Sequence, residues 1–225
     1  MSLARKVRAV ASLVPFWIKA SSNGALITPE SLLSFAYKCP GIHPMQVRSE
    51  FLEFAYIVQG RKPKAFLEIG TRNGGMFFVL CRLSDPQAIV ISLDLPGGKF
   101  GGGYTAFQIP VMWRMKKTGQ QLHLLRTDSH RAETKTRTQR ALNGSQLDLL
   151  FIDGDHTYEG VRKDFEMYSP LVRPGGLIAF HDIVEIAEPD FGVPKFWNEV
   201  KTRYTHTELV ENPRQGWGGL GLLYL

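Results

Sequence analysis

The stretch "AFLEIGTRNGGMFFVLCRLS", residues 65–84, decides the fold. Its first six residues form a short apolar run that ends in glycine, which is typical of a buried strand. A turn containing Gly70 and Gly74 follows, and residues 74–84 form a mostly apolar segment that looks helical. A strand that passes through a tight glycine turn into a helix predicts the first unit of an α/β fold.

The same alternation continues toward the C-terminus. Further strands are expected at 88–95, 122–128, 147–154 and 176–183, with helices between them at 106–119, 131–143 and 158–172. Alternation of this kind predicts a Rossmann-like, doubly wound, mostly parallel sheet with helices on both faces. Ligands of such sheets bind beyond the carboxyl ends of the strands.

The two ends of the chain follow other patterns. After a helix expected at 193–204, strands at 206–211 and 218–225 are joined only by "NPRQGW". This connection is too short for a parallel crossover, so we expect an antiparallel strand at one edge of the sheet. Before residue 64 the apolar spacing is helical. We therefore expect an N-terminal helical cap over residues 1–60 and a ligand-binding domain over residues 61–225.

The composition favours one globular domain, since 225 residues with 44% hydrophobic side chains can build a real core. Cys39 and Cys81 fit no zinc or disulfide pattern, which indicates a reducing, cytoplasmic setting. The net charge of +6 is scattered, so it favours nucleic acid only weakly. Residues 1–20 have helical apolar spacing but are short and contain Pro15, so we expect neither a signal peptide nor a membrane span. Packing on the domain is favoured, and peripheral membrane contact stays open.

Acidic side chains stand at equivalent places, at or just after the ends of the five expected parallel strands. Carboxylates gathered at one sheet edge repel one another unless a ligand or cation separates them. Each acid alone would be interpreted as a helix cap or turn residue. Together they predict a ligand site, formed by Glu68, Asp94, Asp128, Asp153 and Asp182.

These motifs resemble, in order, those of class I S-adenosylmethionine-dependent methyltransferases, over roughly residues 64–225. The matching segments are "LEIGTRNGG", "ISLDL", "LLRTDSH" and "FIDGDHTYEGVRKDFEMYSPLVRPGGLIAFHDI". The last is similar to a bacterial branch that contains sugar and macrolide O-methyltransferases and cephalosporin-hydroxylase-like proteins. The resemblance implies the class I methyltransferase fold, S-adenosyl-L-methionine as cofactor and a small-molecule or saccharide acceptor.

The resemblance also implies a role for each cofactor-side residue. The turn after the first strand would hold the methionine part, the second-strand acid would accept both ribose hydroxyls, and the third-strand segment would contact adenine. The cofactor-binding residues implied in this way are Glu68, Gly70, Gly74, Asp94, Asp128, Ser129 and Asp153.

In the sugar and macrolide branch a divalent metal is held by an acid after the fourth strand and an acidic pair after the fifth. A histidine three residues beyond the first acid is the base. The resemblance therefore implies His156 as general base and Asp153, His181 and Asp182 as metal ligands. His181 replaces an acid, and an imidazole suits manganese, iron or zinc better than magnesium. Asp155 is expected to cap the following helix.

Other functions stay open from the sequence. An iron-dependent hydroxylase of the cephalosporin-hydroxylase-like type would use the same ligands. A nucleic-acid-modifying protein is disfavoured, because "DGDH" replaces the Asn/Asp-Pro-Pro-aromatic turn of base amino-methylases. A binding protein without catalysis is disfavoured because His156 and its neighbouring acids are present. The glycine-rich residues 96–103 are interpreted as a lid or a plain connection, and a homo-oligomer stays open.

Overall fold

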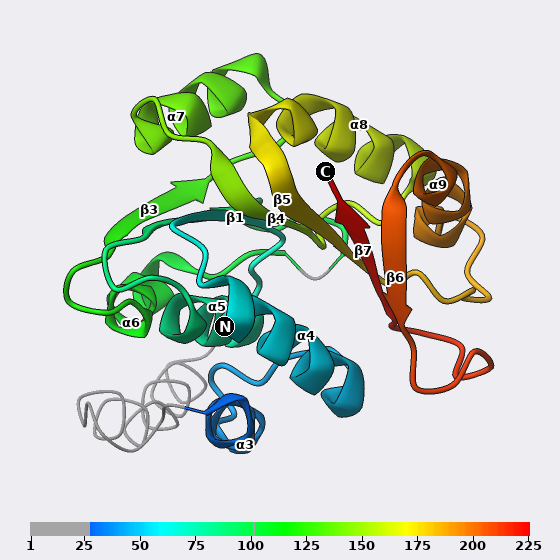
Figure 1. The fold of residues 1–225 in the computed structure, drawn as a ribbon, viewed down its shortest axis with the longest axis horizontal. Coiled ribbons are helices and arrows are strands. Elements are labelled where there is room, and N and C mark those ends of the chain that lie inside the picture. The colour runs from blue at the N-terminus through cyan, green and yellow to red at the C-terminus, as the bar shows by residue number, and fades with distance from the viewer. Residues whose placement is uncertain (1–27, 101) are drawn as a thin grey trace.

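A seven-stranded sheet lies between two layers of helices in the computed structural model, which describes residues 28–100 and 102–225 (Figure 1). The strand order is β3-β2-β1-β4-β5-β7-β6. Strands β1 to β5 pair in parallel, and β7 is antiparallel to both β5 and β6. The predicted mixed sheet is therefore confirmed. The strands are β1 (Ala65–Ile69), β2 (Ile89–Asp94), β3 (Gln121–Arg126), β4 (Leu147–Ile152), β5 (Val172–His181), β6 (Thr205–Leu209) and β7 (Leu220–Tyr224).

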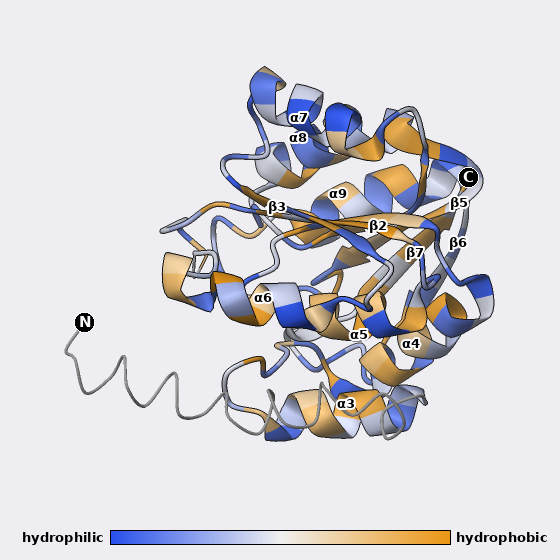
Figure 2. Ribbon diagram, turned by 90° about the vertical axis from the view of Figure 1, so that its left-hand side faces the viewer, coloured by the Kyte–Doolittle hydropathy of each residue, from blue (hydrophilic) through white to orange (hydrophobic). Residues whose placement is uncertain are grey.

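Helices cover both faces of the sheet, as Figure 2 shows, with α7, α8 and α9 on one face and α4, α5 and α6 on the other. Helix α3 lies outside α4 and α5. The α-helices are α3 (Pro29–Lys38), α4 (Arg48–Arg61), α5 (Gly75–Leu83), α6 (Ile109–Met115), α7 (Ala132–Leu142), α8 (Tyr158–Tyr168) and α9 (Val193–Val200). Short 3-10 turns are η1 (Ala106–Gln108), η2 (Ser169–Leu171) and η3 (Lys201–Arg203).

Two apolar clusters form the core, one on each face of the sheet. Leu67 of β1 and Phe180 of β5 face α8 and α9, whereas Phe66 and Phe151 face α4 and α5. These side chains are fully buried, and each such burial stabilises the fold by about 1.5–3 kcal/mol. Helices α3 and α4 share the second cluster with α5, so the described part of the cap packs directly on the sheet domain.

Three helices are shorter than the sequence predicts. The helix expected at 106–119 begins as the 3-10 turn η1 and becomes α6 only where Pro110 occupies its first turn. The helix expected at 158–172 ends at Tyr168, because Pro170 lies in η2 and β5 begins at Val172. The helix expected at 193–204 ends at Val200 and continues as η3. The amphipathic segment expected at 1–20 lies outside the described residues.

The chain reverses its direction of travel across the sheet between β1 and β4. From β1 it adds β2 and β3 on one side, and then returns to place β4 and β5 on the other. In an open α/β sheet the carboxyl ends of the strands at such a reversal form the ligand crevice. Within the described residues, no helix is long and apolar enough to cross a membrane.

Candidate active site

A cavity of about 650 Å³ opens at the carboxyl ends of the parallel strands. Its wall contains all five acids that the sequence predicts to gather there, one from the end of each parallel strand. Ser129, His156 and His181 line the same cavity. The predicted site residues are therefore neighbours in the structure, with one exception.

The exception is Gly74, which is not on the cavity wall. It begins α5 in the left-handed conformation (φ 84°), and an added Cβ would lie 2.6 Å from Cε of Met115. Gly70 does line the cavity, and its φ is 90°. A Cβ there would lie 1.8 Å from the carbonyl oxygen of Asp153. Glycine is thus required at residue 70 for the β1 turn to pass the end of β4.

Two buried acids occupy the wall beside this turn. Glu68 is 1% exposed, and burial raises the pKa of its carboxyl well above the usual range. Its Oε2 has no hydrogen-bond partner within the described residues. Asp94 accepts the backbone N–H of Arg72, and burial raises the pKa of its carboxyl to about 6. Both carboxyls are therefore poised to gain from a cationic or hydrogen-bonding ligand.

The loop after β3 is held by a buried pair that the sequence analysis missed. Asp128 Oδ1 accepts the backbone N–H of His130 at 2.8 Å, and His130 Nε2 lies 3.3 Å from Oδ1 of the fully buried Asp164. Tyr168 donates to the carbonyl of Ser129 at 2.7 Å. A signal for Asp164 exists in the sequence, because a carboxylate interrupts the buried stripe of α8 there.

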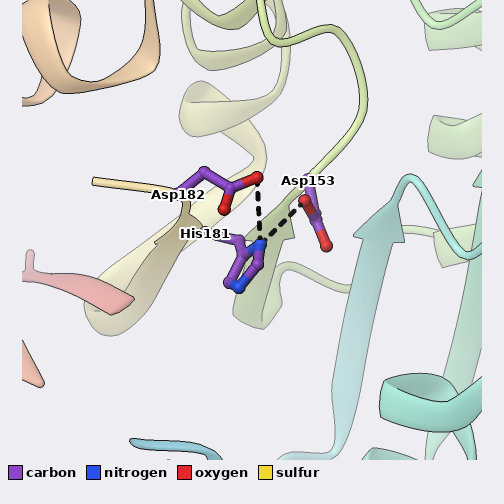
Figure 3. Close-up of side chains that lie close together, drawn as sticks. All are labelled: Asp153, His181 and Asp182. Carbon is purple, nitrogen blue, oxygen red and sulfur yellow. Dashed lines mark ion pairs between the residues drawn. The ribbon is translucent and has the colours of Figure 1, made fainter. Parts of the chain in front are cut away.

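The centre of the site is a triad of Asp153, His181 and Asp182 (Figure 3). His181 Nδ1 lies 3.3 Å from Asp153 Oδ1 and 3.3 Å from Asp182 Oδ2. Burial lowers the pKa of His181, but the two carboxylates outweigh burial and hold that pKa well above the usual range. Its buried Nε2 has no partner within the described residues.

Asp182 has a strained backbone that places it in this triad. Its φ is 62°, which is uncommon for a residue other than glycine. The N–H of Gly218, next to β7, donates to Asp182 Oδ1 at 3.0 Å. The antiparallel hairpin therefore holds one of the site's acids in place.

His156 lies beside the triad. Its Nε2 is 3.5 Å from Asp153 Oδ1, and its Nδ1 is 3.7 Å from Asp182 Oδ2. Phe100 stacks on the imidazole at 4.8 Å between ring centroids, and Phe191 meets it edge-on at 4.9 Å. Burial opposes protonation, but the carboxylate of Asp153 raises the pKa of His156. The imidazole is thus held between aromatic rings and acids.

Asp155 does not cap α8, contrary to the prediction. Thr157 is the N-cap, and its hydroxyl accepts the N–H of Gly160 at 3.0 Å. Asp155 Oδ1 instead accepts the N–H of Thr157 at 2.9 Å. Asp155 therefore stabilises the turn that leads into α8, by binding the N–H of the N-cap residue rather than by being the N-cap itself.

The cap contributes a residue to the site that the sequence analysis also missed. Gln46, between α3 and α4, donates from Nε2 to Asp153 Oδ2 at 3.1 Å. Met45 and His43 line the same cavity, as does Trp217 of the β6–β7 connection. No periodicity marks these loop residues in the sequence, so no pattern could have found them.

Known proteins share both the sequence pattern and the fold. A family model described as "Methyltransferase domain" matches residues 67–183, which contain most of the parallel sheet and all of the triad. The chain belongs to the methyltransferase-domain family. The class I methyltransferase resemblance inferred from the sequence is therefore confirmed.

Two solved structures illustrate the shared fold. The O-methyltransferase TomG from Streptomyces achromogenes, in complex with SAM, is 18% identical with a TM-score of 0.59, covering 86% of this chain and 89% of that one. CalS11, a TDP-rhamnose 3'-O-methyltransferase of calicheamicin biosynthesis, is 15% identical with a TM-score of 0.55, covering 76% of each chain. At these identities the likeness concerns the fold alone.

A curated relative is longer than this methyltransferase-family chain. The uncharacterized protein y4gI of Sinorhizobium fredii is 29% identical over 150 residues, which span 64% of this chain and 16% of that protein. The match therefore covers only a small part of the relative.

Proposed function

We propose that this chain transfers a methyl group from S-adenosylmethionine to a hydroxyl of a small molecule or saccharide. The observation that carries the proposal is the placement of His156 and the triad in the same cavity as Glu68 and Asp94. Methyl transfer to a hydroxyl needs a base and a bound cofactor. In this proposal His156 is the base beside the carboxylates of the triad, and Glu68 and Asp94 bind the cofactor in the same cavity. That reaction requires in-line alignment and removal of the hydroxyl proton.

The cavity fits the cofactor at several atoms. Glu68 Oε2 is buried and has no partner among the residues that the structure describes, and the ammonium of the methionine part would pair with it. Asp94 offers a second carboxylate, suited to the two ribose hydroxyls. Asp128 and Ser129 line the wall where adenine would lie. Gly74 begins α5 outside the cavity wall, so its proposed contribution is to the conformation of the cofactor-binding turn.

His156 acts as the general base in the proposed mechanism. Asp153 Oδ1 lies 3.5 Å from Nε2 of His156, and Asp182 Oδ2 lies 3.7 Å from Nδ1. Phe100 and Phe191 fix the plane of the ring. The neutral imidazole would accept the proton of the acceptor hydroxyl at Nδ1, which lies beyond hydrogen-bond distance of Asp182. The hydroxyl oxygen bonds to the methyl carbon as the carbon–sulfur bond of the sulfonium breaks, and S-adenosylhomocysteine leaves. The neighbouring carboxylates stabilise the imidazolium that forms.

The triad also fits a divalent metal ion. One ligand atom from each of Asp153, His181 and Asp182 lies within 4.8 Å of the others. Two carboxylates and one imidazole form a mixed oxygen and nitrogen set, which suits manganese or iron better than magnesium. A bound metal would supply Lewis acidity to the acceptor hydroxyl. The chain's own contribution is to hold the two carboxylates on either side of His181.

The two predicted regions have separate tasks in this proposal. Residues 61–225 hold the cofactor and the reacting groups. Within the cap predicted over residues 1–60, the segment that contains Met45 and Gln46 lines the cavity, and we assign it to the acceptor side. Acceptor choice is therefore assigned to the cap and to the β6–β7 connection.

Calorimetry with S-adenosylhomocysteine, followed by a methyl-transfer assay, tests the function. We expect binding by the wild-type chain, methylation of a hydroxyl acceptor, and loss of turnover in His156→Gln with S-adenosylhomocysteine affinity retained. His206→Gln is the matched control, since His206 is exposed on β6 and is not on the cavity wall. Absence of binding would refute the proposal. Turnover that instead depends on iron, oxygen and a reductant would identify the hydroxylase.

A further inference from the structure

We propose that Gln46 binds the acceptor, and that the acceptor presents two adjacent hydroxyl groups. In this assignment Gln46 Oε1 accepts a hydrogen bond from the hydroxyl next to the one that is methylated. The inference rests on the proposed function and adds to it the residue that selects the acceptor and the chemical class of that acceptor, a vicinal diol.

The first observation is a buried amide oxygen without a partner. Gln46 is 6% exposed, and its Oε1 has no hydrogen-bond donor within the described residues. Its Nε2 donates to Asp153 Oδ2 at 3.1 Å. The amide cannot be turned over, because its oxygen would then face the carboxylate. Oε1 is therefore held away from Asp153 as an unused acceptor, which is costly unless a ligand supplies the donor.

The second observation is that the segment carrying Gln46 is fixed before any ligand binds. The hydroxyl of Tyr37, in α3, donates to the carbonyl of Gln46 at 2.7 Å. Upstream, the backbone of Ile42 and Pro44 packs against the first turn of α5, where a Cβ on Gly75 would lie 2.3 Å from the carbonyl oxygen of Ile42. Gln46 is thus preorganised by the cap on one side and the cofactor-side helix on the other.

The third observation is the position of Gln46 relative to the base. Asp153 Oδ1 faces His156 and Asp153 Oδ2 faces Gln46, so the two side chains flank one carboxylate. His156 takes a proton from the reacting hydroxyl, and Gln46 Oε1 can take only a hydrogen bond. A diol with neighbouring hydroxyls satisfies both groups.

The surrounding wall favours a ring as the carrier of that diol. Met45 and Trp217 line the cavity and are 48% and 44% exposed, respectively, as large apolar side chains on the cap and on the β6–β7 connection. Apolar surfaces of this kind pack against the flat face of a sugar ring or an aromatic ring. Saccharides and catechols both offer such a ring with adjacent hydroxyls, and the experiment separates them.

The test is a methyl-transfer assay with radiolabelled S-adenosylmethionine, methyl glycosides of hexoses and 6-deoxyhexoses, and substituted catechols. The best substrate is then compared with its analogue lacking the hydroxyl next to the methylated position. Both are assayed with wild type, with Gln46→Met, which keeps length but cannot hydrogen-bond, and with the matched control Gln139→Met on the exposed face of α7.

We expect Gln46→Met and removal of the hydroxyl each to lower kcat/KM by about 10- to 100-fold. Combining the two should cause little further loss, because both remove the same hydrogen bond. S-adenosylhomocysteine affinity should stay within about twofold, and Gln139→Met should behave as wild type.

Four results would overturn the assignment. Multiplicative losses in the combination would show that Gln46 does not touch that hydroxyl. Equal kcat/KM of Gln46→Met and wild type for the diol would show that Gln46 Oε1 makes no bond to the acceptor. Wild type that binds S-adenosylhomocysteine and methylates every mono-hydroxyl analogue as well as its diol would refute the diol class while leaving the proposed methyltransferase intact. A chain that binds S-adenosylhomocysteine but methylates no compound in the panel would also refute this assignment, whereas absence of S-adenosylhomocysteine binding would overturn the proposed function itself.

Discussion

Replacing Asp94 by asparagine should make the free protein more stable and cofactor binding weaker. Asp94 is 9% exposed, and burial raises the pKa of its carboxyl from 3.8 to about 6. That difference corresponds to about 3 kcal/mol, since one pKa unit is worth about 1.4 kcal/mol. Ionised Asp94 therefore lowers the free energy of unfolding by up to about 3 kcal/mol, and Asn removes the charge while keeping the shape.

The pH dependence of this effect has a definite sign. The folded state binds the Asp94 proton more tightly than the unfolded state, so the free energy of unfolding contributed by this group falls as pH rises from about 4 to about 6. Above that range the loss is complete. Asp94→Asn should thus match wild type near pH 4 and exceed it by up to about 6–12 °C in Tm at pH 8, at about 2–4 °C per kcal/mol for a chain of this size.

Cofactor affinity should change in the opposite direction. If Asp94 accepts the ribose hydroxyls, loss of the charged acceptor costs about 1.5–3 kcal/mol, or about 10- to 150-fold in Kd. Differential scanning fluorimetry with and without S-adenosylhomocysteine measures both effects, because a ligand raises Tm according to its concentration relative to Kd. Glu133→Gln, at an exposed carboxyl of α7, is the control. A variant that is less stable at pH 8, or that binds S-adenosylhomocysteine as well as wild type, would refute the reasoning.

Three further predictions concern the remaining parts of the site. Burial opposes protonation of His156, but the carboxylate of Asp153 raises its pKa, so kcat/KM should fall as pH drops through a value above 6.5. If His156→Gln keeps the same dependence of kcat/KM on pH, His156 is not the base. Chelation should lower activity, with Mn²⁺ restoring more of it than Mg²⁺, and His181→Ala should weaken Mn²⁺ binding measured by calorimetry at least tenfold; full activity in excess EDTA would exclude metal assistance. Lys99→Ala breaks an exposed ion pair with Asp190 and should change Tm by less than about 4 °C. Proteolysis within residues 95–103 should become faster. Equal cleavage rates in the variant and wild type would show that this ion pair does not hold the loop over His156.

The gathering of acids at one edge of the sheet could be predicted from the sequence because it follows from periodicity. Strands read as apolar runs, their ends carry the acids, and parallel strands bring those ends to one edge. Glu68, Asp94 and Asp182 reach the cavity for that reason. Gly74 does not reach the cavity wall, because spacing predicts that a glycine is needed in a turn but not which side of the turn faces the cavity.

The acceptor side could not be predicted because its contacts join distant loops. Gln46 and Asp153 are 107 residues apart, and nothing in the residues around Gln46 indicates that its amide meets a strand end. The buried pair of His130 and Asp164 has the same character, although a carboxylate within an apolar helical stripe was a usable sign. Such contacts depend on how the cap packs against α5, which is a property of the three-dimensional core.

The conformation of Asp182 connects these two sides. Its left-handed backbone is sparsely populated for a residue other than glycine, so surrounding contacts must hold it. Those contacts come from the β6–β7 connection, where Gly218 donates to Asp182, and that connection is held in turn by Glu50 of α4, which is 2% exposed and accepts the N–H of Gly219 at 2.9 Å. A carboxylate of the cap therefore fixes, through two glycine amides, an acid of the triad. The same connection carries Trp217, which lines the cavity, so a change in how α4 packs against it would move both Trp217 and Asp182. Under the proposed function, acceptor choice and reactivity would therefore change together.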